Sequence, residues 1–139
     1  MLFRSKESEL VDDAMFLLGR SFYWRSEYLR AIQAFRDLET NFPDSEYFNR
    51  ARYWRALCME KQRIDSEAQQ LYRALVEEAE EETAAQAGWR LGEMAYANED
   101  YVAAAQEYRS ALDAFPDASI RAALLLRLGS SLQIGRAHV

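Results

Sequence analysis

The chain has 139 residues, of which 50% are apolar and 29% are charged, and its formal net charge is −6 at pH 7. The apolar content is sufficient for one folded domain, and no stretch approaches the roughly 20 apolar residues that a membrane span needs. The acidic balance argues against nucleic-acid binding, which requires clustered Lys and Arg. The single cysteine, Cys58, excludes an internal disulfide. Its apolar neighbours predict a buried, unreactive thiol.

Apolar residues recur with a helical period along nearly the whole chain. Turn residues support the helix boundaries, since Asp65 and Asp100 are suited to N-cap positions and Pro43 and Pro116 cannot continue a preceding helix. The acidic run 77–82 is interpreted as a solvated helix end and loop. Helices are expected at about 7–24, 27–41, 46–61, 65–79, 83–98, 101–115 and 119–133.

Small residues return inside alternate helices at a fixed spacing: Gly19, Ala56, Gly92 and Gly129 lie 37, 36 and 37 residues apart. Glycine inside a helix costs about 1 kcal/mol relative to alanine, so each position is expected to mark the close approach of a second helix. The alanine found twelve residues later, as in Ala31, is the expected contact. The aromatic residues four positions further on are expected to fill the gap toward the next repeat: Phe35, Tyr72 and Tyr108.

This periodicity predicts an all-α fold, a right-handed α-solenoid of antiparallel helix pairs, with a first helix A and a second helix B in each repeat. About three and a half repeats are expected within residues 1–133, at about 12–45, 46–81, 82–118 and 119–133. The last of these consists of an A helix alone.

The chain resembles the tetratricopeptide repeat family over about residues 12–133. The shared pattern is a large apolar residue, a small residue, an apolar residue three further on, and then Ala, an aromatic, a small or apolar residue and Pro. The second repeat departs from it at Arg55 and at Glu80, which replace the apolar residue and the proline. The matching residues are Leu18, Gly19, Phe22, Ala31, Phe35, Leu38 and Pro43; Ala56, Met59, Ala68, Tyr72 and Leu75; Leu91, Gly92, Ala95, Ala104, Tyr108, Ala111 and Pro116; and Leu128, Gly129 and Leu132.

The junctions between repeats are two or three residues longer than is usual in the family, as in NFPDSEYFNRARYW. This version looks like the bacterial envelope branch, which includes the lipoprotein of the outer-membrane β-barrel assembly machine and the Tol-Pal-associated coordinator. The resemblance implies a scaffold of the cell envelope, in the periplasm or at the outer membrane if a signal sequence precedes the chain. The alternatives are a cytoplasmic adaptor and the targeting module of a larger enzyme or regulator.

The resemblance also implies that the A helices line a concave groove. Residues six and three positions before the small residue, and one and four after it, are expected to face a partner. This aromatic trough edged by mixed charge suits a peptide with apolar anchors. Trp24 and Trp54 are expected to pack between repeats instead. The expected groove residues are Phe16, Arg20, Tyr23, Arg50, Tyr53, Leu57, Gln86, Trp89, Glu93 and Tyr96.

No arrangement of residues indicates an enzyme, a metal site or a cofactor. Asp12 and Asp13 are adjacent carboxylates near a helix start, where negative charge complements the helix dipole. The only histidine, His138, belongs to a six-residue tail, 134–139, that matches the translation of a widely used sequencing adapter. The tail is therefore interpreted as non-native and the chain as truncated near Leu132. The last helix would then keep an uncovered apolar face, which offers a route to self-association.

Overall fold

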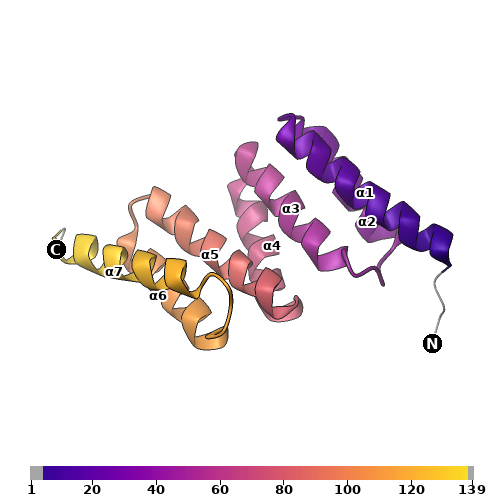
Figure 1. The fold of residues 1–139 in the computed structure, drawn as a ribbon. Helices are drawn as coiled ribbons and strands as arrows, with labels where there is room; N and C mark the ends of the chain where they lie inside the picture. Colours follow the sequence, from indigo (N-terminus) through magenta and orange to yellow (C-terminus); the bar gives the residue numbers. More distant parts are fainter. Residues whose placement is uncertain (1–4, 138–139) are drawn as a thin grey trace. The chain divides into compact units, whose positions relative to one another are not determined.

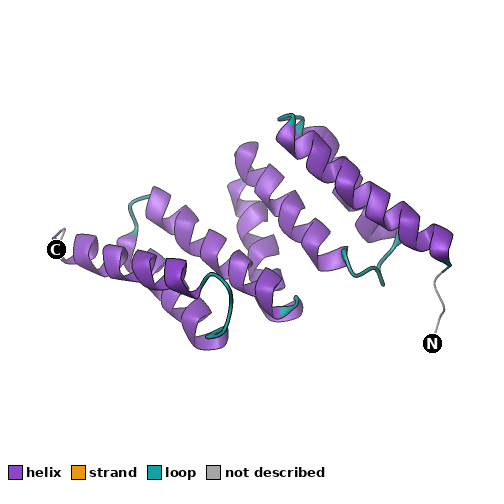
Figure 2. Cartoon of the chain, in the orientation of Figure 1, coloured by secondary structure: helices purple, strands orange, loops and turns teal. Residues whose placement is uncertain are grey.

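The computed structural model describes residues 5–137, and this part of the chain contains seven α-helices and no strand (Figures 1 and 2). The all-α fold class is thereby confirmed. Apart from the end of the last helix, every boundary falls within two residues of its expected position. The helices are α1 (Lys6–Trp24), α2 (Tyr28–Asn41), α3 (Phe48–Lys61), α4 (Asp65–Glu78), α5 (Glu81–Ala97), α6 (Tyr101–Ala114) and α7 (Arg121–Ala137).

The chain forms two compact units that divide between Leu71 and Tyr72, within α4. In the first unit α1 packs on α2 and α2 on α3, and α1 also touches α3. In the second unit α5 packs on α6 and α6 on α7 (Figure 1). Neighbouring helices therefore pack in the order expected of a tetratricopeptide solenoid. Among residues 5–137, no helix is both long and apolar enough to span a bilayer.

Helix α7 runs to Ala137, past the expected end at residue 133. The reason is packing: Ile134 and Gly135 are half-buried, and a Cβ on Gly135 would lie 3.7 Å from the Cβ of Tyr101 in α6. His138 and Val139 lie outside the described residues.

The turn after each complete A helix uses one residue in the left-handed region. Ser26, Arg63 and Glu99 have φ of 60°, 61° and 60°, and they repeat at the spacing of the small residues. The following N–H returns to a carbonyl in the last turn of the helix, as from Glu27 to Phe22 at 2.8 Å. This left-handed C-cap satisfies the last carbonyls and reverses the chain within three residues.

Two glycines of the A helices, Gly19 and Gly92, face aromatic rings of the B helices. A Cβ on Gly19 would lie 2.5 Å from Cε1 of Phe35, and a Cβ on Gly92 would overlap the ring of Tyr108. Both rings are fully buried. The expected close approach is confirmed, but the atoms nearest to each glycine belong to the aromatic ring and not to the alanine four residues earlier. Gly129 has nothing within 4 Å of the position its Cβ would take.

Asp12 is buried in the middle of α1, so the expectation that it stabilises a helix start is wrong. Its carboxylate accepts a 2.5 Å hydrogen bond from Ser45 Oγ, and Ser45 also accepts one from the backbone N–H of Tyr47. Asp100, in contrast, is confirmed as an N-cap, because its side chain accepts a 3.1 Å bond from Ala103 N.

Candidate partner-binding surface

Aromatic side chains of α1 and α3 meet on one surface of the first unit, the α1–α3 face. The ring of Tyr23 is in its centre, with edge-on contacts to Trp24 at 5.0 Å, Trp54 at 5.1 Å and Tyr28 at 5.7 Å between ring centroids. Because α1 and α3 are the A helices of consecutive repeats, this surface combines predicted groove positions with three residues that were not predicted to lie in the groove, Trp24, Tyr47 and Trp54. Its components are Phe16, Arg20, Tyr23, Trp24, Tyr47, Arg50 and Trp54.

Arg20 lies within this aromatic cluster. Its guanidinium carbon is 5.0 Å from the ring centroid of Trp54 and 5.8 Å from that of Phe16, which is a cation–π arrangement. The Nε–H is buried and has no hydrogen-bond partner among the described residues. A buried donor without an acceptor costs about 1–3 kcal/mol. Arg20 is therefore the unsatisfied polar group of the α1–α3 face.

Phe16 is only 2% exposed, so the expectation that its ring is open to a partner is wrong. Tyr47 stacks on it at 4.7 Å between centroids, with an interplanar angle of 23°. The guanidinium of Arg50 lies over both rings, at 4.8 Å and 5.1 Å. A hydrogen bond to Asp13 raises the pKa of Tyr47. Phe16 is therefore the base of the face, and Arg50 is its exposed edge.

Trp24 is 68% exposed, so the expectation that it packs between repeats is wrong. It lies in the last turn of α1, where its ring makes edge-on contacts with those of Tyr23 and Trp54. Trp54 is half-buried between α1 and α3, as expected of an inter-repeat contact. The remaining predicted groove residues are all half-buried: Tyr23, Tyr53, Leu57, Gln86, Trp89, Glu93 and Tyr96.

The second unit has a corresponding surface on α5 and α7, but its charges pair with each other. Both carboxylate oxygens of Glu93 accept bonds from Arg127, at 2.8 Å and 3.2 Å, and one also accepts a 2.6 Å bond from the hydroxyl of Tyr108. Arg127 lies 4.3 Å over the ring of Tyr96. Burial, followed by the bond to Glu93, raises the pKa of Tyr108 and keeps its hydroxyl a donor.

The repeat register makes the two surfaces directly comparable. Arg20 and Glu93 each follow the glycine of their A helix, and Trp54 and Arg127 each lie two residues before the small residue of the next A helix. At these equivalent positions, the first unit therefore has the cation–π contact of Arg20 with Trp54, and the second unit has the ion pair of Arg127 with Glu93. Glu93 is satisfied internally, and Arg20 is not. The sequence pattern did not predict Tyr47 or Arg127 as surface residues, because neither lies six or three positions before, or one or four after, the small residue of its own repeat.

Short repeated helix pairs with a shared A-helix surface define the class of the protein: an α-helical repeat protein. Two family models, both described as tetratricopeptide repeat, match it, one at residues 13–45 and 50–80 and the other at 66–119. The chain belongs to the tetratricopeptide repeat family. No curated protein matches it.

Tetratricopeptide repeats form scaffolds for protein–protein interaction and are generally non-catalytic. Within residues 5–137, no group of three or more His, Cys, Asp or Glu side chains is placed to hold a metal ion. The side chain of Cys58 is fully buried, and this burial raises the pKa of its thiol to about 12. The chemistry that the surface offers is therefore recognition by aromatic contact, cation–π contact and hydrogen bonding.

Proposed function

We propose that this scaffold binds an acidic segment of a partner protein, with apolar anchors, on the α1–α3 face. The observation that carries the proposal is the half-buried guanidinium of Arg20, which has no ion-pair partner among the described residues, four positions before the exposed Trp24 in α1. A ligand carboxylate would pair with this guanidinium. Exposed aromatic rings provide contact area at low entropic cost and are enriched at binding hot spots.

The local charge supports an acidic ligand. Neither Arg20 nor Arg50 forms an ion pair within the described part of the chain, whereas Arg55 is bound to Glu39 at 2.7 Å and Arg127 to Glu93. The net charge of −6 disfavours an anionic ligand over the chain as a whole. An acidic segment is therefore expected to bind where unpaired arginines lie beside aromatic rings.

The test uses two synthetic peptides with the same apolar residues, one with Glu and the other with Lys at the charged positions. Intrinsic tryptophan fluorescence, to which the exposed Trp24 contributes, and calorimetry report binding. The Glu peptide is expected to bind, and Arg20→Ala is expected to weaken it by about tenfold, the usual effect of losing a hot-spot contact. Arg36→Ala, at an exposed position of α2, is the matched control. Equal binding of both peptides, or no effect of Arg20→Ala, would refute the proposal.

We further propose that the scaffold works in the bacterial cell envelope. The support is the long junction between repeats, which is similar to that of the envelope branch of the family. Sequencing of the locus beyond both ends separates this proposal from its alternatives. A signal sequence with a lipid-attachment cysteine upstream supports the envelope. A cytosolic start supports a cytoplasmic adaptor, and a downstream catalytic domain supports a targeting module of a larger enzyme or regulator.

A further inference from the structure

A cavity of about 270 Å³ lies in the second unit, between α5 and the neighbouring helices α4 and α6. Gly88 and Leu91 of α5 line it and are both buried. Val76 of α4 completes this apolar base, since its Cγ2 would lie 4.0 Å from a Cβ on Gly88. This space, the α4–α6 cavity, therefore combines an apolar base with three charged residues: Arg73, Glu77 and Glu107.

In the first unit, an ion pair between α2 and α3 occupies the corresponding place. The Nε–H and Nη2–H groups of Arg55 donate to the two carboxylate oxygens of Glu39, at 2.7 Å and 2.8 Å. The two side chains are only 16% and 12% exposed, so the pair is largely buried. The α4–α6 cavity is therefore found where the equivalent arginine side chains are missing. The repeat register aligns Arg55 with Leu91, Glu39 with Val76, and Arg52 with Gly88.

The charged residues of the α4–α6 cavity leave one carboxylate in excess. Arg73 donates a 2.6 Å bond to Oε1 of Glu107, so these two charges offset each other. Glu77 is exposed and forms no hydrogen bond or ion pair with any other residue of 5–137. It also begins the acidic run 77–82, which makes the local potential more negative. The cavity therefore favours a positively charged occupant, with Glu77 as its counter-charge.

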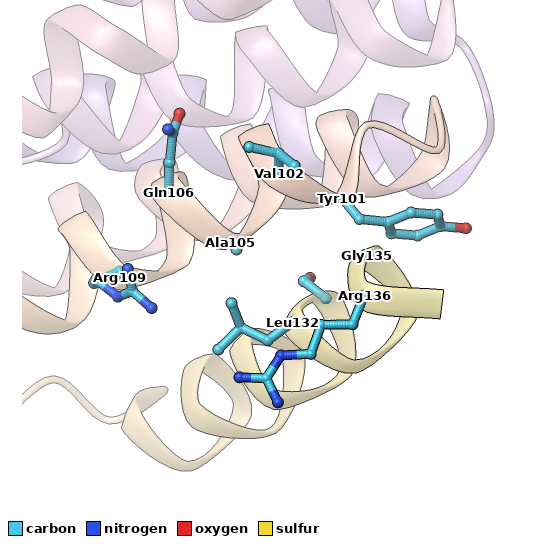
Figure 3. A pocket seen from close by; sticks show the side chains of 9 residues that line it. Tyr101, Val102, Ala105, Gln106, Arg109, Leu132, Gly135 and Arg136 are labelled. Atoms are coloured by element: carbon cyan, nitrogen blue, oxygen red, sulfur yellow. The ribbon is translucent and has the colours of Figure 1, made fainter. Parts of the chain in front are cut away.

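The cavity between α6 and α7 has the opposite charge. Figure 3 shows Arg109 of α6 and Arg136 of α7 on its walls, and no carboxylate of the described residues lines it. A cationic side chain would be repelled there by two guanidinium groups. Such a side chain should therefore discriminate between the two cavities and enter the α4–α6 cavity.

We propose that the α4–α6 cavity binds an arginine side chain of a partner protein. Its methylene groups would lie against Leu91 and Val76, and its guanidinium would pair with Glu77 and with Oε2 of Glu107. An arginine suits this place better than a lysine, because its planar fork can bond two carboxylates while its stem remains in apolar contact. The α4–α6 cavity is separate from the α1–α3 face, and the inference is independent of the function proposed for that face.

The probe is a capped tripeptide, acetyl-Ala-Arg-Ala-amide, titrated into the isotope-labelled full chain and followed by NMR. The backbone amides of Gly88 and Ser110, which line the cavity, are expected to shift saturably. The same tripeptide with citrulline, a neutral group of equal shape, should bind at least about fivefold more weakly. The lysine tripeptide should also bind more weakly. Equal binding of the arginine and citrulline tripeptides, or no shift at the cavity, would overturn the proposal.

Two substitutions in the acidic run separate the cavity from the general negative charge. Glu77→Gln should weaken binding of the arginine tripeptide by about threefold, the modest effect expected at an exposed position. Glu81→Gln removes the same charge from outside the cavity and is the matched control, so the affinity should not change. Equal losses in the two variants would show that diffuse charge holds the arginine, and the proposal would fail.

A double variant, Val76→Glu with Leu91→Arg, transfers the ion pair of the first unit into the α4–α6 cavity and should abolish tripeptide binding. Arg20→Ala should leave the tripeptide affinity unchanged, which separates this cavity from the α1–α3 face. Two results would assign the cavity to another occupant and overturn the proposal. One is tighter binding of free arginine than of the capped tripeptide, which would indicate a small-molecule site. The other is a dimer in light scattering that Glu77→Gln converts to monomer.

Discussion

Asp12 in α1 and Ser45 after α2 form a buried hydrogen bond at a place where the second unit has two buried alanines, Ala85 and Ala118. The same position in the repeat therefore tolerates a polar pair or an apolar pair. Replacing only one of the two residues leaves the other buried without this hydrogen bond. That loss of folding free energy is larger than the loss expected when both are replaced.

We predict that Asp12→Ala and Ser45→Ala each destabilise the protein by about 1–3 kcal/mol. The double variant should lie within about 1–2 kcal/mol of wild type, because neither the Asp12 carboxylate nor the Ser45 hydroxyl is then left buried without the other. Urea unfolding of the four proteins in the cycle measures this coupling. Additive losses would show that the pair does not act as a unit.

Alanine at two equivalent glycines should have opposite effects. Gly92→Ala places a Cβ against the buried ring of Tyr108 and should destabilise by about 1–3 kcal/mol through overpacking. Gly129→Ala meets no described atom and should stabilise α7 by up to about 1 kcal/mol. Thermal unfolding of both variants checks the signs. A stabilising Gly92→Ala would contradict the assignment of this position as a helix-crossing notch.

The left-handed turn residues are predicted to be sites where glycine stabilises. Glu99 has φ of 60°, a region that costs a non-glycine residue roughly 1–2 kcal/mol. Because glycine also loses more chain entropy on folding, Glu99→Gly should raise stability by about 0.5–1 kcal/mol. The adjacent Asn98 has φ of −86°, so Asn98→Gly should give no gain. Comparison of the two melting temperatures provides the test.

Cys58 should resist alkylation in the native state, because burial raises the pKa of its thiol to about 12 and leaves it protonated at pH 8. The native state then binds more protons than the unfolded chain above about pH 9, where an exposed thiol ionises. This part of the stability is present below pH 9 and should fall as the pH rises from 9 to 12. Iodoacetamide labelling with and without urea, and unfolding of Cys58→Ala across this range, check both expectations. Rapid native labelling would show that the thiol is accessible.

The positions of the helices could be predicted because each has a period, a cap or a breaker in its own sequence. The end of α7 could not, since the helix continues where Gly135 packs against Tyr101, a contact made by residues distant in sequence. The same limit applies to the surface. The repeat register brought Arg20 and Tyr23 into the candidate site, but burial of Phe16 depends on Tyr47, which stacks on it from outside the helix. The exposure of Trp24 could not be predicted either, because it depends on how closely other helices pack against the end of α1.

The three-residue turns between paired A and B helices have a consequence for the fidelity of folding. The B helices share one pattern, so side chains alone discriminate weakly between a correct partner and its equivalent in another repeat. A short tether holds each B helix next to its own A helix at an effective concentration in the millimolar range. Correct pairing thus depends on chain connectivity, because the tethered helix outcompetes the equivalent helix of another repeat or another molecule.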